Sequence, residues 1–124
     1  MNALGRFGED HAARWLQESG CTVLERGWRF GHGEIDLIIL DGEDLAFVEV
    51  KTRGTGARYP AQDAVTPAKQ GRLVRAALCY LQEHPGGLQP RFDVCEVYVS
   101  PERRVWVRYL ENAFDGNGLP DPGI

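Results

Sequence analysis

The sequence predicts a mixed α/β fold, a β-sheet flanked by helices, and the strongest signal lies in its middle. Residues 37–40 and 45–48 are two apolar runs separated by a short polar stretch that contains Gly42, the pattern of a β-hairpin. Because neither run is interrupted, both faces of this hairpin need to be covered, as in α/β proteins. Helical patterns before and after the hairpin supply that cover. With the remaining strands, the expected order is α-β-β-β-α-β-β.

The first helix is expected over residues 4–19, and Gly20 ends it in the usual C-cap position. Glu9 precedes Leu16 by nearly two full turns, so its side chain points with Leu16 toward the core. A buried carboxylate is rare unless it is paired or bound to a metal. The alternative is a first-turn glutamate that the helix dipole favours. The spacing alone leaves both interpretations open.

A strand with a break near Gly27 is predicted over residues 21–30. Together with the hairpin, this strand is expected to form a three-stranded antiparallel meander. Residues 52–65 predict a loop rich in small residues. This loop leaves the hairpin directly after Lys51 and therefore borders its open end. Arg53 and Gln62 are candidates for substrate contacts there, although polar loop residues are usually only solvated.

A second helix is expected over residues 66–83, begun by Thr66 as N-cap and Pro67 at the first helical position. Lys69 lies in the first turn, where the helix dipole attracts anions, and phosphate is the obvious candidate. With Arg72 it makes a short basic ridge, and the alternative is a solvated basic face. Two further strands are expected over residues 91–100 and 104–110.

The composition is that of one globular domain. Of the 124 residues, 43% are hydrophobic and 26% are charged. We expect one domain over residues 1–114 and a flexible tail, rich in Gly, Pro and Asp, over residues 115–124. No stretch approaches the roughly 20 apolar residues of a membrane span, and no secretory signal is visible, so we expect a cytoplasmic protein. The net charge of −4 argues against generic, charge-driven binding of nucleic acid, although catalytic carboxylates contribute to it.

The open end of the hairpin carries a charge conflict. The turns that fit the sequence give one register, with Asp36 opposite Glu49 and Glu34 opposite Lys51. Like charges directly opposite each other destabilise a sheet, and such conflicts are expected where function overrides folding. A divalent cation such as Mg²⁺ or Mn²⁺ resolves this one, because hard cations bind carboxylate oxygens together with phosphate. An ordinary solvated strand pair is the alternative, but it explains the opposed acids poorly.

These residues resemble known proteins. Asp36 followed by Glu49-Val50-Lys51 resembles the core of the PD-(D/E)xK nucleases, which include restriction endonucleases and Holliday junction resolvases. More closely, residues 33–38 and 47–53 resemble the uncharacterised, bacterial YraN-like family. The resemblance implies a restriction endonuclease-like fold. It also implies a metal-site role for Glu9 and a site role for Lys69, and it makes Asp93 a structural residue of a core strand.

We therefore expect a metal-dependent, nuclease-like protein that hydrolyses DNA phosphodiester bonds, with resolvase-like, structure-selective cleavage as the sharper expectation. Asp36 and Glu49 hold the metal, and Glu9 holds it directly or through water. Lys51 orients the attacking water, and Glu34 holds Lys51 in place. Substrate contacts are expected from four residues, Arg53, Gln62, Lys69 and Arg72.

Two other classes of function compete with this one. A nucleic-acid-binding module could keep the fold and cut little or nothing by itself, in keeping with the acidic balance and small size. An interaction protein could carry the carboxylate pair as a vestige. A resolvase needs two active sites and hence a homodimer, but the sequence shows no interface signature, and protein partners stay open.

Overall fold

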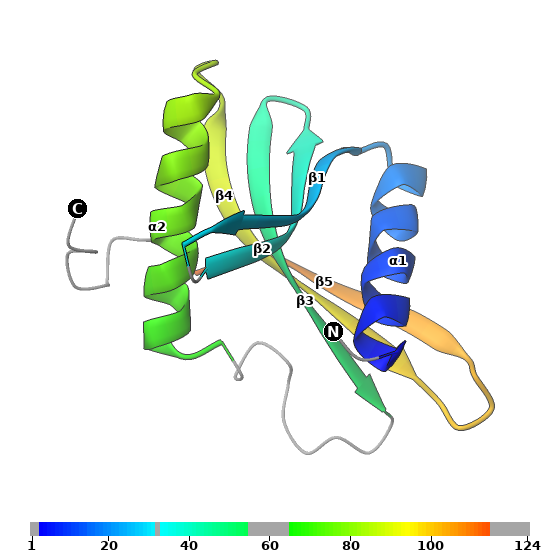
Figure 1. Ribbon diagram of the computed structural model, residues 1–124. Helices are drawn as coiled ribbons and strands as arrows, with labels where there is room; N and C mark the ends of the chain where they lie inside the picture. The colour runs from blue at the N-terminus through cyan, green and yellow to red at the C-terminus, as the bar shows by residue number, and fades with distance from the viewer. Residues whose placement is uncertain (1–2, 32, 55–64, 115–124) are drawn as a thin grey trace.

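Five strands form one mixed sheet between two helices (Figure 1). The computed structural model describes residues 3–31, 33–54 and 65–114. The elements are α1 (Ala3–Glu18), β1 (Thr22–Phe30), β2 (Gly33–Asp41), β3 (Asp44–Gly54), α2 (Pro67–Glu83), β4 (Gln89–Val99) and β5 (Val105–Phe114). The predicted fold class and the order α-β-β-β-α-β-β are confirmed.

The strands lie in sequence order, β1-β2-β3-β4-β5, and all neighbours are antiparallel except β3 and β4. A parallel pair needs a crossover connection, and α2 provides it between β3 and β4. The first three strands form the expected antiparallel meander. The crossover places the first turn of α2 close to the end of β3 that carries Glu49 and Lys51, and this proximity shapes the site described below.

Each helix covers one face of the sheet with its own hydrophobic core (Figure 1). Alternate strand residues point to opposite faces, so the uninterrupted runs of β2 and β3 feed both cores. Ile38, Phe47, Leu73 and Tyr80 belong to the α2 side. Leu16, Leu37, Val48 and Cys95 belong to the α1 side. This two-sided burial confirms the expectation that both faces of the hairpin are covered.

The ends of the helices follow the expected chemistry. Thr66 caps α2, and its Oγ1 accepts a hydrogen bond from the backbone N–H of Lys69 at 3.2 Å, with Pro67 at the first helical position. The helix ends at Glu83. Gly20 follows α1 with a φ of +96°, a left-handed conformation that glycine adopts without steric cost.

The strands differ from the prediction at their ends. β1 runs through Gly27 without the expected break, because its pairing with β2 continues on both sides of that residue. β3 continues to Gly54 because Thr52 to Gly54 pair with β4, so the loop begins later than expected. β5 reaches Phe114, four residues beyond the predicted end, because Phe114 pairs with Phe92.

In the described part of the chain, no helix is long and apolar enough to cross a membrane. The flexible tail expected over residues 115–124 lies outside the described residues, as does most of the predicted loop, including Gln62.

Candidate active site

Asp36 lies where β2 separates from β3. The two strands pair in the predicted register as far as Leu37 opposite Val48. One residue further, the direct pairing of Asp36 with Glu49 is replaced by a different contact. The backbone N–H of Val50 donates a hydrogen bond to Asp36 Oδ2 at 2.8 Å. Asp36 is therefore anchored to β3 by its side chain.

The separation coincides with a change of face in β2. Leu37 packs in the core under α1, whereas Ile35 packs in the core under α2. Two residues of the same strand with equal parity would normally share a face. The backbone thus rotates around Asp36, and its carboxylate lies between the two layers of the molecule.

The charge state of Asp36 reflects this position. Burial, and after it the negative charge of Glu49, raises the pKa of Asp36 from 3.8 to about 7, against the opposing effect of the hydrogen bond from Val50. Glu49 is itself only 5% exposed. The predicted conflict between the two carboxylates is therefore present in the folded protein. Its effect is the raised pKa of Asp36.

Two lysines contact Glu49. Lys51 Nζ lies 3.2 Å and Lys69 Nζ 2.5 Å from Glu49 Oε1. Burial and the hydrogen bond with Lys69 lower the pKa of Lys51. Burial also disfavours charge on Lys69, but its hydrogen bonds to Glu49 and Lys51 prevail and raise its pKa. The first turn of α2 thus delivers Lys69 to the carboxylates, beside the lysine of β3.

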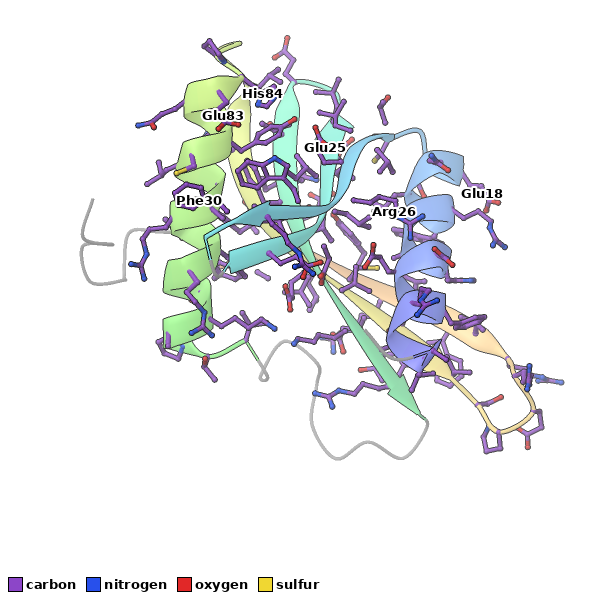
Figure 2. All side chains as sticks on the ribbon, in the orientation of Figure 1. Glu18, Glu25, Arg26, Phe30, Glu83 and His84 are labelled. Atoms are coloured by element: carbon purple, nitrogen blue, oxygen red, sulfur yellow. The ribbon has the colours of Figure 1, made fainter. Side chains whose placement is uncertain are left out.

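Glu9 reaches the site from α1. It is 7% exposed, as the prediction of an inward-facing glutamate requires. Its Oε1 accepts a hydrogen bond from Arg26 Nε at 3.4 Å (Figure 2 shows Arg26 reaching from β1 toward α1). Its Oε2 is buried without a hydrogen-bond partner in the described structure. A buried carboxylate oxygen without a hydrogen bond is costly in free energy, so we expect this atom to bind a ligand.

A close contact between α1 and β3 fixes the position of Glu9. A Cβ added at Gly8 would lie 1.7 Å from Thr52 Oγ1, so only glycine fits there. The backbone of α1 consequently touches β3 one residue beyond Lys51. Thr52 lies 44 residues beyond Gly8 (52 − 8), too far along the chain for the contact to be inferred from spacing.

Two hollows meet at the carboxylate pair. The α2 hollow has a volume of about 310 Å³ and is lined by Gly33, Glu34, Asp36, Glu49, Lys69 and Arg72, among others. The α1 hollow has a volume of about 300 Å³ and is lined by Glu9, Asp36, Glu49, Lys51 and Thr52, among others. Because Asp36 and Glu49 line both, the two hollows adjoin at the carboxylates, and we call the pair of hollows the groove.

The prediction that Glu34 lies opposite Lys51 and holds it in place is wrong. β2 has already left β3 at this point and stays paired with β1, so Glu34 lies opposite Arg29. The Arg29 Nη2–Glu34 Oε2 distance is 3.8 Å, whereas Lys51 pairs with Glu49. Glu34 lines the α2 hollow instead.

The remaining predicted site residues are only partly brought together. Arg72 lines the α2 hollow beside Lys69, as the basic ridge predicts. Arg53 lies on β3 opposite Tyr98 of β4, and its Nε is buried without a hydrogen-bond partner in the described structure. It lines neither hollow as described. The prediction for Gln62 falls on a residue outside the described ranges.

The donor set fits a hard divalent cation with two protein ligands. Among the described residues, no three His, Cys, Asp or Glu side chains converge closely enough to hold an ion together. Asp36 and Glu49 supply two carboxylates, and Mg²⁺ commonly uses one or two, completing its shell with water and phosphate oxygens. Because Glu9 does not converge with the pair closely enough to make a third ligand, its unsatisfied Oε2 would reach such an ion through water.

A second acidic cluster, which we call the Arg91 cluster, lies at the turn end of the same hairpin. Arg91 is 6% exposed and pairs with Asp41, Asp44 and the fully buried Asp93 at 2.9–3.0 Å. The Tyr109 hydroxyl also donates to Asp93 Oδ2 at 2.6 Å. These contacts tie the hairpin turn to β4 and β5, in agreement with the structural role expected for Asp93.

Comparisons with known proteins place the chain in a family. A UPF0102 protein of Frankia casuarinae is 47% identical over 115 residues, covering 91% of this chain and 97% of the relative. A UPF0102 protein of Symbiobacterium thermophilum is 49% identical over 113 residues, covering 90% and 95%. The solved structure of Pyrococcus furiosus SfsA in complex with Ca²⁺ has a TM-score of 0.42 and 14% identity, covering 86% of this chain and 63% of that chain. The sequence pattern of the uncharacterised protein family UPF0102 matches residues 8–97. The chain therefore belongs to the uncharacterised protein family UPF0102, which confirms the YraN-like membership expected from its motifs.

Proposed function

We propose that the protein is a metal-dependent nuclease that hydrolyses phosphodiester bonds of DNA, with resolvase-like, structure-selective cleavage as the finer part of the proposal. One observation carries it. Asp36 and Glu49, carboxylates from two separating strands, meet at the centre of a groove that also contains Glu9, Lys51 and Lys69. Charges are seldom gathered in this way for stability alone, because burying charged groups is costly even when they are paired.

The carboxylate pair is the metal-binding part of the proposal. Asp36 and Glu49 would hold Mg²⁺ or Mn²⁺, with Glu9 contributing through water. Such an ion lowers the pKa of a bound water and offsets the charge that develops on phosphate. Arg26 acts on Glu9 as a positioning residue, since it binds Oε1 and leaves Oε2 without a hydrogen-bond partner in the described structure.

Lys51 has the properties of the residue that handles the water. It lies beside Glu49 in the α1 hollow, and its pKa is lowered by burial and by Lys69. A lysine with a lowered pKa is more often a neutral amine, which can accept a proton from the attacking water at Nζ. Its protonated form stabilises the phosphate charge. Both tasks require Nζ to lie beside the carboxylates, as it does at 3.2 Å from Glu49.

Lys69 and Arg72 supply the contacts to the DNA backbone. Lys69 is one-third exposed in its side chain and sits in the first turn of α2, where backbone N–H groups also favour anions. It can exchange its ion pair with Glu49 for one with a substrate phosphate. Arg72 extends this positive charge along the α2 hollow. We keep Arg53 as a further phosphate contact, on the strength of its unsatisfied Nε.

A second candidate function is a nucleic-acid-binding module that uses the same groove without cutting. Lys51 and Lys69 already balance the charge of Glu49. Within the described ranges, the site also lacks a set of three converging acidic, histidine or cysteine ligands. Both observations favour binding of phosphate over tight binding of a metal.

Calorimetric titration of Mg²⁺ and Mn²⁺ into the wild type and Asp36→Asn separates these functions. Each titration is repeated with a short DNA duplex present, because a site with two carboxylates gains affinity once phosphate completes it. Asp10→Asn is the matched control, since Asp10 lies beside Arg26 but lines neither hollow as described. The same three proteins are then tested for cleavage of branched, flapped and single-stranded DNA.

We expect metal uptake and cleavage by the wild type and by Asp10→Asn, and loss of both in Asp36→Asn. The nuclease is excluded if uptake is independent of Asp36 both with and without the duplex. DNA binding that persists without metal-dependent cleavage would establish the binding module in its place.

A further inference from the structure

Phe30 is a large apolar side chain that remains 46% exposed at the end of β1. Figure 2 shows it on the side of the sheet that α2 covers. It lines a third hollow of about 270 Å³, the Phe30 hollow, together with Gly31, Gly33, Arg72 and Arg75. An exposed aromatic ring that shares a hollow with two arginines offers a flat apolar surface next to positive charge.

The Phe30 hollow continues the groove of the proposed active site. It shares Gly33 and Arg72 with the α2 hollow, which in turn shares Asp36 and Glu49 with the α1 hollow. The three hollows therefore run from the exposed ring of Phe30, past Arg72, to the carboxylate pair. A ligand that reached from the carboxylates into the Phe30 hollow would pass Gly33 and Arg72.

The end of the β1–β2 pair that carries Phe30 lies close to α2. A Cβ added at Gly33 would lie 3.7 Å from the Arg72 carbonyl oxygen and 3.8 Å from Ala76 Cβ, so one methyl group would bring β2 into van der Waals contact with the helix. Phe30 consequently lines the same hollow as Arg72 and Arg75 of α2.

The chemistry of the hollow matches one nucleotide. An aromatic ring stacks on the face of any base, and arginine guanidinium groups bind the phosphates that flank it. A base inside a duplex has both faces covered by its neighbours, so only an unpaired base can stack on a protein ring. The positive charge of Arg72 and Arg75 complements a phosphodiester backbone, in a molecule that is acidic as a whole.

We propose that the Phe30 hollow binds an unpaired nucleotide next to the phosphate held at Asp36 and Glu49. This inference rests on the proposed function and names its substrate class. The preferred DNA carries a single-stranded extension, as overhangs, flaps and open junctions do. Phe30 stacks on the base, and Arg75 binds its phosphate.

The test compares two fluorescein-labelled DNAs by fluorescence anisotropy. One is a blunt duplex, and the other is the same duplex with an unpaired thymidine tail. Ca²⁺ replaces Mg²⁺ so that binding can be followed on intact DNA, and gels verify that the DNA is uncut. Phe30→Leu removes the ring but keeps apolar volume, and Phe30→Trp keeps a ring. Leu24→Ala is the control, because Leu24 is 42% exposed on the same strand and lines none of the three hollows.

We expect the wild type to prefer the tailed duplex about tenfold, the effect of one stacked base. Phe30→Leu loses this preference, whereas Phe30→Trp and Leu24→Ala retain it, and all four proteins bind the blunt duplex equally. Arg75→Gln weakens binding of the tailed duplex and lowers the slope of its salt dependence by about one.

Each negative result excludes a different part of the proposal. A wild type without tail preference, or a Phe30→Leu variant that weakens both DNAs equally, overturns the nucleotide subsite. Metal uptake and cleavage then still report separately on the carboxylate pair. A protein that binds neither DNA refutes the subsite and the proposed function together.

Discussion

Buried carboxylates lie near both ends of the β2–β3 hairpin, and their surroundings differ. In the Arg91 cluster at the turn end, Asp93 of β4 receives hydrogen bonds from Arg91, Tyr109 and the backbone of Asn112. At the other end, Asp36 receives one from the backbone of Val50, and its pKa is raised to about 7 by burial and by Glu49.

The difference lies in the cations that surround the two sets of carboxylates. In the Arg91 cluster, a guanidinium group provides a planar fork that matches several carboxylates at once, so the buried charges are satisfied within the fold. In the groove, lysines provide point charges that can exchange one anion for another. Asp93 is thus held by several contacts from one arginine, whereas Glu49 meets two separate lysines through one carboxylate oxygen.

The largest effect is expected from Arg91→Met. Removing the guanidinium leaves Asp93 buried with its charge uncompensated, which typically costs about 3–5 kcal/mol of unfolding free energy. Urea denaturation measures the loss. Arg75→Met is the control, because it removes the same charge from an exposed position and should cost less than about 0.5 kcal/mol. Equal losses in the two variants would mean that the Arg91 cluster has no special structural role.

Asp36→Asn should act in the opposite direction. The folded protein keeps the proton of Asp36 up to a pH of about 7, whereas the unfolded chain releases it near 3.8. Folding of the wild type therefore becomes less favourable as the pH rises through this window, and the penalty is complete above it. The amide removes the penalty.

At pH 8 we expect Asp36→Asn to be more stable than the wild type by up to about 4 kcal/mol, because each pKa unit corresponds to about 1.4 kcal/mol, and at pH 4 we expect little difference. Thermal unfolding at the two pH values measures both. An Asp36→Asn variant that is destabilised at pH 8 would show that this carboxylate, like Asp93, is needed for the fold.

The smallest effect is expected from Lys69→Met. Lys69 lowers the pKa of Asp36 through its charge, so its removal should raise that pKa further. Because the lysine side chain is one-third exposed, we expect the interaction to be worth about 1 kcal/mol or less. Carboxyl NMR titration of Asp36 measures the shift. A downward shift would contradict the electrostatic role assigned to Lys69.

The sequence was sufficient for the parts of this molecule that depend on local patterns. The register of β2 and β3 follows from the apolar runs and the turn at Gly42, and the start of α2 follows from Thr66 and Pro67. Asp36 and Glu49 stand out because two acids that oppose each other in one register are a conflict that the order of residues alone reveals.

The parts that could not be predicted depend on packing between distant segments. Arg26 and Glu9 are 17 residues apart, and Arg91 and Asp41 are 50 residues apart, so no spacing rule connects them. The error at Glu34 has the same origin. Its pairing with Arg29 arises because β2 rotates at Asp36 to serve a different core on each side, and a strand pattern taken alone assumes that the rotation is absent.

The separation of β2 from β3 has a dynamic consequence. From Asp36 to Gly33, β2 stays paired with β1, so this end of the two strands is a two-stranded arm that rests on α2 (Figure 1). Two-stranded ribbons are marginally stable in water by themselves. The amide hydrogens of the arm should therefore exchange with solvent through local opening, well before those of the central strands. Any ligand that bridges the arm and α2 would slow this exchange. The exchange rates of the arm would then show whether the groove is occupied, without a chemical label.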